Sequence, residues 1–363
     1  MSITVSPPLH AAASSPVTSN DTLLPVLRVI PQQCYERSNR KAAALVARAV
    51  SLWTVAIAAL AFTNSWYLVV PLWIFASLAV SGLFVLGHDC AHGALFESKA
   101  LNRSVGRALM APSLHIFEAW VVGHNRIHHG HTLRQGMDFV WHPNTVEEFG
   151  AMGRGQQLRH RFEWSAIGSG AYYLRSIWWQ KMIRFSAPQR YRAAVRKDRQ
   201  FLAVVVSLGI TTVVAFTIGF DGSIGGAAWN VVKLLVVPFV GFCYSIGSIV
   251  YVHHIAPDIK WWPRRSWNSF HGQVEGTTVL NVPKFLNALF FYNIMVHVPH
   301  HVDVRIPCYE LPRAAAAIIK AFPDVDHRPM RLAEFAKTTR ICKLYDFDRQ
   351  IWLSYRGDAA KGI

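Results

Sequence analysis

The chain has 363 residues, of which 52% are hydrophobic, and it carries a formal net charge of +16. Its five cysteines are scattered and never form a C-x-x-C pair, which excludes a zinc ribbon or a four-cysteine iron–sulfur cluster. In so apolar a chain, the basic excess is explained more simply by anionic membrane lipid than by nucleic acid, so no nucleic-acid partner is expected.

Four segments are long and apolar enough to cross a bilayer, which requires about 20 mostly apolar residues. The predicted spans cover residues 42–62, 66–87, 201–220 and 230–253. The predicted fold class is therefore an all-α membrane protein with four transmembrane helices in two hairpins. Residues 1–25 are rich in Ser, Pro and Thr and are expected to form a disordered tail, whereas 26–363 should form a single integral-membrane domain.

The segments outside the spans, 88–200 and 254–363, are predicted to form a helical cap on one side of the membrane. Within them, residues 101–123 are apolar but interrupted by charged residues and a proline, which favours an interfacial or re-entrant helix. The two loops on the opposite side, 63–65 and 221–229, contain no Lys or Arg. The positive-inside rule therefore predicts that the cap and both termini are cytoplasmic.

Three histidine clusters fall in the predicted cap or at its boundary. They are His88 and His92, then His124, His128 and His129, and finally His297, His300 and His301. Residues three or four apart on a helix share a face, so each cluster should present its imidazoles together, and all three clusters lie on one side of the membrane. Eight imidazoles are too many for one tetrahedral zinc and suit two metal ions with open positions, although zinc remains the main alternative to iron.

The histidine pattern H-x3-H, H-x3-H-H and H-x2-H-H on four spans resembles that of the membrane fatty acid desaturase and hydroxylase superfamily. It is most similar to the Δ12/ω3-type acyl-lipid desaturases. The similarity begins near Ile30 and is carried by residues 30–38 (IPQQCYERS), 71–96 (PLWIFASLAVSGLFVLGHDCAHGALF) and 293–312 (NIMVHVPHHVDVRIPCYELP). The resemblance adds a ninth metal ligand, His254, seven residues before Trp261 and preferred to its neighbour His253.

The resemblance implies an O2-dependent fatty acid desaturase with two non-haem iron ions (Fe2+/Fe3+) and no catalytic residue beyond the metal ligands. Such an enzyme introduces a cis double bond, here of Δ12/ω-6 or ω-3 type, into a fatty acyl lipid or acyl-CoA. The spacing between His124 and His128 is three residues, where this subfamily more often has two, so a hydroxylase, ketolase or epoxygenase stays open. Pro299 predicts that the third cluster lies at a helix start or kink, and Asn293 is expected to orient a water or ligand.

No electron-carrier motif is present, so a separate ferredoxin or cytochrome b5 is expected to dock on the cytoplasmic side. A basic run is expected either to steer this acidic partner or to bind anionic lipid. The run consists of Arg190, Arg192, Arg196, Lys197 and Arg199. A metal transporter is the alternative from a different class, but it would place ionisable residues along the middle of the spans, which are nearly free of them.

Overall fold

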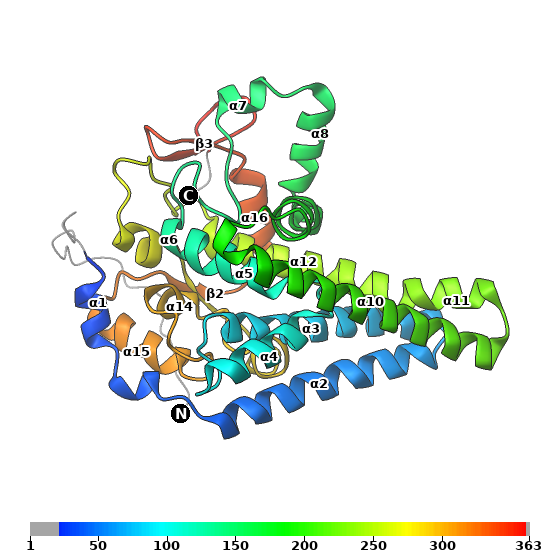
Figure 1. The fold of residues 1–363 in the computed structure, drawn as a ribbon. Coiled ribbons are helices and arrows are strands. Elements are labelled where there is room, and N and C mark those ends of the chain that lie inside the picture. Colours follow the sequence, from blue (N-terminus) through cyan, green and yellow to red (C-terminus); the bar gives the residue numbers. More distant parts are fainter. Residues whose placement is uncertain (1–21, 361–363) are drawn as a thin grey trace.

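The computed structural model describes residues 22–360, which are mostly helical (Figure 1). Four helices are long and apolar enough to cross a membrane: Asn39–Ala61, Trp66–Ala91, Gln189–Phe220 and Ile224–His254. They run side by side from a large cap at one end of the molecule, confirming the predicted fold class of a helical membrane protein with four spans. Most of the predicted disordered tail, residues 1–21, lies outside the described residues.

The first two spans are α2 (Asn39–Ala61) and α3 (Trp66–Ala91), joined by a turn at 62–65. The hydroxyl of Ser38 starts α2 by accepting a hydrogen bond from the amide of Lys41 at 3.3 Å. The apolar stretch of α3 is 56% buried, whereas that of α2 is 17% buried. Helix α3 is therefore the centre of the bundle, and it carries the first histidine cluster at its end.

The third span is α10 (Arg192–Asp221), and the fourth is a continuous run of α11 (Ile224–Val231), η5 (Val232–Val236) and α12 (Val237–His254). The predicted loop at 221–229 is wrong in extent, because only residues 222–223 interrupt the helices. Gly222 ends α10 in a left-handed conformation with φ of 65°, and the Ser223 hydroxyl accepts from the amide of Gly226 to start α11. The glycines at 225 and 226 suggested a longer loop, but the cap formed by Ser223 starts the helix before them.

The segment at 101–123 forms two helices instead of one. Helix α4 (Lys99–Met110) ends before a turn at 111–116, and α5 (Phe117–Val122) follows. Leu114 takes a left-handed conformation with φ of 55° in this turn. Helix α5 then continues without a break into the π-helix η2 (Gly123–His128) and α6 (His129–His131).

The remaining short elements complete the cap. The chain begins with α1 (Leu24–Val29) and η1 (Gln32–Tyr35). Between α6 and α10 lie α7 (Val146–Gly150), α8 (Arg154–Glu163), α9 (Ser169–Tyr172), η3 (Tyr173–Ile183) and η4 (Gln189–Tyr191). After α12 come η6 (His271–Glu275), β1 (Val279–Asn281), α13 (Lys284–Leu286), η7 (Asn287–Phe291), α14 (His297–Val302), α15 (Leu311–Ala321), β2 (His327–Pro329), α16 (Leu332–Ile341), β3 (Leu344–Asp346) and β4 (Ile351–Leu353).

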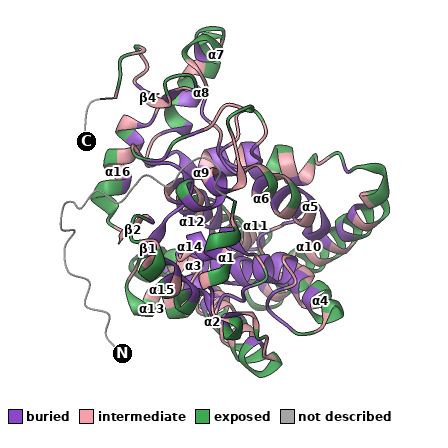
Figure 2. Cartoon of the chain, turned by 90° about the vertical axis from the view of Figure 1, so that its left-hand side faces the viewer, coloured by how far each residue is buried: buried purple, intermediate pink, exposed green. Residues whose placement is uncertain are grey.

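Two small sheets tie distant parts of the cap together. Strands β1 and β2 are parallel, with Val279 opposite His327, and β3 and β4 are antiparallel, with Leu344 opposite Leu353. Figure 2 faces the cap end of the molecule, and its buried residues gather around α3, α12 and α14. The histidine clusters lie on or beside these three helices, so the fold brings them into the most buried part of the cap.

Candidate metal centre

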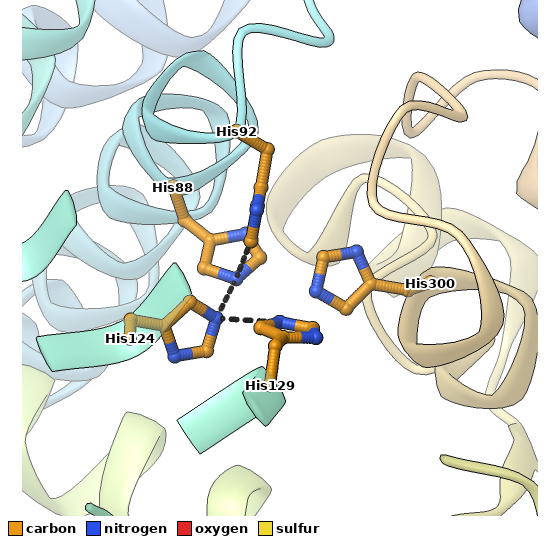
Figure 3. A group of neighbouring side chains, drawn as sticks. All are labelled: His88, His92, His124, His129 and His300. Atoms are coloured by element: carbon orange, nitrogen blue, oxygen red, sulfur yellow. Dashed lines mark hydrogen bonds between the residues drawn. The ribbon is translucent and has the colours of Figure 1, made fainter. Parts of the chain in front are cut away.

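The structure brings the histidine clusters together in two adjacent groups where the ends of α3 and α12 meet η2, α6 and α14. The first group contains His88, His92, His124, His129 and His300, and the second contains His128, His254 and His301. Within each group the ring nitrogens that can bind a metal lie within 4.8 Å of one another. Figure 3 shows the five rings of the first group arranged around a common centre.

The nitrogen spacing in the first group matches that of ligands around one ion. The Nε2 atom of His124 lies 2.7 Å from that of His88 and 3.1 Å from that of His129, and the Nε2 atoms of His88 and His92 are 3.3 Å apart. Two nitrogens bound at right angles, each about 2.1 Å from a metal ion, are themselves about 3 Å apart. The donor set therefore fits a metal centre.

The second group is adjacent to the first and includes the ninth expected histidine. The Nε2 atom of His297 lies 3.1 Å from that of His301, so this ring completes a set of four. The His254 ring centroid lies 4.9 Å from those of both His128 and His301. His254 is one of the three histidines of the second group, whereas His253 stacks on His297 with 3.8 Å between the ring centroids.

The second histidine cluster is divided between the groups, contrary to the expectation that its three rings share one face. That expectation assumed an α-helix, but Gly123–His128 is a π-helix and the amide of His129 bonds to the carbonyl of His124, five residues earlier. A π-turn brings residues five apart together. His124 and His129 therefore meet in the first group, while His128 points to the second.

The third cluster occupies a helix start, as Pro299 predicted. Helix α14 begins at His297, which puts Pro299 in the first turn, where its missing amide proton is not needed. The adjacent residues His300 and His301 project in different directions from this short helix. His300 belongs to the first group and His301 belongs to the second.

Burial keeps the imidazoles neutral, which is the form that binds a metal. Burial is the largest cause of the lowered pKa of six grouped histidines that lie outside the four long apolar helices. These residues are His92, His124, His129, His297, His300 and His301. Several buried ring nitrogens find no hydrogen-bond partner among residues 22–360. They are Nδ1 of His88, His92, His124 and His129, and both nitrogens of His300.

In the second group the Nδ1 atom of every ring forms a hydrogen bond to a nearby oxygen, which fixes the orientation of the ring. His128 donates to Asp138 Oδ1 at 2.8 Å, and His301 donates to Gln273 Oε1 at 2.7 Å. His254 and His297 donate to the carbonyls of Gly276 and Ile294, at 3.0 and 3.2 Å respectively. Such bonds select one tautomer and leave the Nε2 lone pair for a metal.

Asp138 remains ionised in this position. Burial alone would raise the pKa of its carboxyl group, but the His128 ring and the amide of Leu133 together hold that pKa below its usual value. Asp138 lies ten residues after His128, a weak sequence signal. Gln273 had no sequence signal, since only the fold brings it beside His301.

Asn293 forms hydrogen bonds with two neighbouring segments of the protein. Its side chain donates to the carbonyl of Cys308 at 2.9 Å and bonds to Asn287, whose oxygen accepts from the amide of Asn293. Both Tyr292 and Asn293 take left-handed conformations, with φ of 44° and 64°. Asn293 therefore stabilises a strained turn before α14.

A small apolar cavity lies against both histidine groups. Its water-accessible volume is about 40 Å³, and its lining includes Phe84, Trp120, Ile246, Val250 and Ile294 together with the histidine rings. The ring of Trp120 stacks on His124 at 4.7 Å. This space suits a short stretch of hydrocarbon beside the ring nitrogens.

Comparisons with known proteins agree with the geometry. A sequence model described as "Fatty acid desaturase" matches residues 64–332. The "sn-1 oleoyl-lipid 12-desaturase" of Anabaena variabilis is 29% identical over 89% of both chains. The "Omega-6 fatty acid desaturase, chloroplastic" of Arabidopsis thaliana is 29% identical over 90% of this chain and 70% of its own, and that of Brassica napus is 30% identical over 90% and 71%.

Proposed function

Because this chain belongs to the fatty acid desaturase family, we propose that it introduces a cis double bond at the Δ12/ω-6 position of a lipid-bound acyl chain. The chain is a membrane-embedded fatty acid desaturase, an oxidoreductase that acts on a fatty acyl substrate. The relatives named for oleoyl-lipid 12-desaturation and ω-6 desaturation support the position of the double bond and the lipid carrier.

The observation that carries this proposal is the convergence of nine histidines from distant segments into two buried groups. We propose that two iron ions bind here. The first would be held by the five-histidine group, and the second by His128, His254, His297 and His301. When bound, such ions supply the O2 and one-electron chemistry needed to break unactivated C–H bonds. The protein contributes neutral imidazoles in fixed tautomers and surroundings that exclude water.

The apolar cavity supports the role of this site in positioning substrate. An acyl chain has no polar group at the reacting methylenes, so only shape and burial can hold them beside the ring nitrogens. Phe84 and Trp120 line one part of the cavity, and Ile246 and Val250 of α12 line another. Desaturation removes one hydrogen atom from each of two adjacent carbons. With O2, two external electrons and two protons, it yields the double bond and two molecules of water.

We further propose that the cap and the histidine groups are cytoplasmic and that residues 26–363 act as one domain. The turns at the far end of the spans carry no Lys or Arg, which supports this sidedness. Burial of Val26 supports the inclusion of the N-terminal segment in the domain. A separate ferredoxin or cytochrome b5 would supply the two electrons.

Product analysis tests the proposal. The chain is expressed in a host that makes oleoyl lipids but no polyunsaturated lipids, and its acyl chains are analysed by mass spectrometry. A loss of two hydrogens, with the new double bond at C12, is the expected result. Addition of oxygen would instead indicate a hydroxylase, ketolase or epoxygenase, and a new double bond elsewhere would overturn the assigned position.

A further inference from the structure

The loop between α12 and η6 covers the segment that follows the second histidine cluster. The amide of Trp262 donates to the carbonyl of Leu133 at 3.0 Å, and the amide of Gln135 donates to the carbonyl of Trp262 at 2.9 Å. The Arg134 guanidinium donates to the carbonyl of Arg264 at 3.0 Å. Residues 258–268 and 132–136 therefore form one joined surface. In Figure 1 it lies beside α6, at the end of the molecule opposite α11.

This surface is strongly basic. Lys260, Arg264 and Arg265 are exposed, and Arg134 is half-buried beside them. Of the acidic residues nearby, Asp258 forms an ion pair with Arg328 at 3.3 Å, and Glu275 accepts a hydrogen bond from His271 at 2.6 Å. We call the four basic residues and Trp267 the basic loop surface.

The basic loop surface is connected to the histidine groups through a short chain of bonds. The indole of Trp267 donates to the carbonyl of Thr132 at 2.8 Å, and the Arg134 guanidinium lies 5.2 Å above the indole ring. The Thr132 hydroxyl donates to the carbonyl of His128 at 2.7 Å and lies 3.4 Å from Nδ1 of His301. Along this chain of bonds, one residue, Thr132, lies between Trp267 and the second histidine group. The contacts therefore provide a short path for electron transfer.

We propose that the basic loop surface is the docking site for an acidic, one-electron redox protein of the ferredoxin type. The inference rests on the proposed function, which requires two electrons per turnover from a separate carrier. Two successive dockings would deliver them, each oxidising one carrier by one electron. Opposite charge favours such an encounter and orients the partner over Trp267.

The basic run at 190–199 has a different position. Arg196 and Lys197 lie in the first turns of α10, which carries no charged residue from 201 to 220. At 1.5 Å per residue, about 6 to 7.5 Å of helix separates these two residues from residue 201. That depth suits lipid headgroups. The basic loop surface belongs to the cap, next to the segment that follows the second histidine cluster, and not to a helix that could cross the membrane.

Zero-length cross-linking of the unmodified enzyme provides the first test. The enzyme in phosphatidylcholine nanodiscs is mixed with a purified plant-type [2Fe–2S] ferredoxin and treated with a carbodiimide, which joins lysine amines to carboxylates. Mass spectrometry is expected to find ferredoxin peptides attached to Lys260. Attachment at Lys197 without attachment at Lys260 would overturn the proposal.

Matched charge reversals provide the second test. Lys260→Glu with Arg265→Glu should raise the KM for reduced ferredoxin roughly tenfold at low salt and leave kcat at saturating ferredoxin unchanged. The difference should shrink at high salt. The same change of charge at Arg196→Glu with Lys197→Glu should raise the KM by less than about twofold. An equal or larger effect of the control pair would overturn the proposal.

Ferredoxin binding measured without turnover separates this proposal from the enzymatic one. Oxidised ferredoxin should bind the wild-type enzyme and bind the Lys260/Arg265 variant roughly tenfold more weakly, whatever product the enzyme makes. If the variant instead loses co-purified anionic lipid and binds ferredoxin normally, the surface binds lipid and the proposal is wrong. If the charge-reversal variant loses its metal, ferredoxin binding is measured instead with Lys260→Gln and Arg265→Gln, which remove the positive charges without adding negative ones. Weaker binding than the wild type is again expected, and unchanged binding would overturn the proposal.

Discussion

The two histidine groups are built from the same side chain but are held in different ways. In the five-histidine group, the Nδ1 atoms find no hydrogen-bond partner within the described part of the chain. In the second group, all four Nδ1 atoms donate to a fixed acceptor. The first group therefore has more ligands, and the second has better-oriented ones.

This difference indicates how each group would reach its final geometry. The rings of the second group are oriented by Asp138, Gln273 and two carbonyls before any metal binds. The rings of the first group are positioned by packing, as when Trp120 stacks on His124 at an interplanar angle of 15°. We expect the second site to depend on its hydrogen-bonded supports and the first to depend on its larger number of ligands.

The largest effect is expected from removing one ligand of each group at adjacent positions of α14. Both His300→Ala and His301→Ala should abolish product. His301→Ala should also lower the metal content from about two ions to about one per chain, because three ligands remain there and the Gln273 side chain loses its hydrogen bond to His301. His300→Ala leaves four imidazoles in the first group and should retain nearly two ions.

Metal analysis of the purified variants measures this difference, with membrane abundance as a check on folding. His327→Gln, in β2 and outside both groups, is the control and should keep full activity and metal. Equal metal loss in His300→Ala and His301→Ala would contradict the contrast between the groups.

The next effect is expected at Asp138. Asp138→Asn keeps one of the two oxygens, of which one accepts from the amide of Leu133 and the other from His128 and the amide of Val140, and it removes the charge that orients His128. Metal affinity should fall about 10- to 100-fold at the second site alone. Competition with a chelator, followed by Mössbauer spectroscopy of 57Fe, resolves the two sites. Asp348→Asn on the surface is the matched control, and weakening of the first site instead would show that the supports are not separate.

A smaller effect is expected at Gln273. Gln273→Leu removes the acceptor for His301 and should weaken the second site about tenfold. Gln273→Glu keeps an oxygen at this position and should restore most of the affinity, although it loses the bond to the carbonyl of His129. Isothermal titration of the metal-free protein with Fe2+ under anaerobic conditions measures both variants. If the glutamate variant binds Fe2+ no more tightly than the leucine variant, loss of the bond to His301 does not explain the weaker binding.

The smallest effect is expected from pH, because both groups are buried. Burial lowers the pKa of His92 and His129 in the first group and of His297 and His301 in the second well below the ordinary value of 6.5. Protons oppose metal binding only when the pH falls towards the lowered pKa. Metal affinity should therefore change by less than about threefold between pH 7.5 and 6.0. For a site made of five exposed imidazoles, metal affinity would fall about a thousandfold over the same range.

Chelator competition across this pH range provides the measurement. Release of one ion before the other above pH 6 would contradict equal protection of the two groups. Exposure of a group by partial unfolding would produce the same early release, so circular dichroism is recorded in parallel as the control.

The family resemblance identified from the histidine pattern is confirmed by the comparisons, and the four spans follow from hydropathy alone. The far-side loop at 221–229 was predicted too long, because the cap formed by Ser223 is a local effect that hydropathy does not report. The bonds between Asn293 and Asn287 were not predicted, because the two side chains meet only through a left-handed turn.

The sequence by itself predicted four apolar spans and placed the three histidine clusters at the same end of them, which indicated that the clusters can meet. Those properties depend on the length and composition of continuous segments. Only the tertiary structure decided how the nine rings divide, since that depends on the π-turn at Gly123–His128 and the two directions taken by His300 and His301. It also supplied Gln273, which lies 28 residues before His301 in the chain and contacts its ring only because η6 folds against α14.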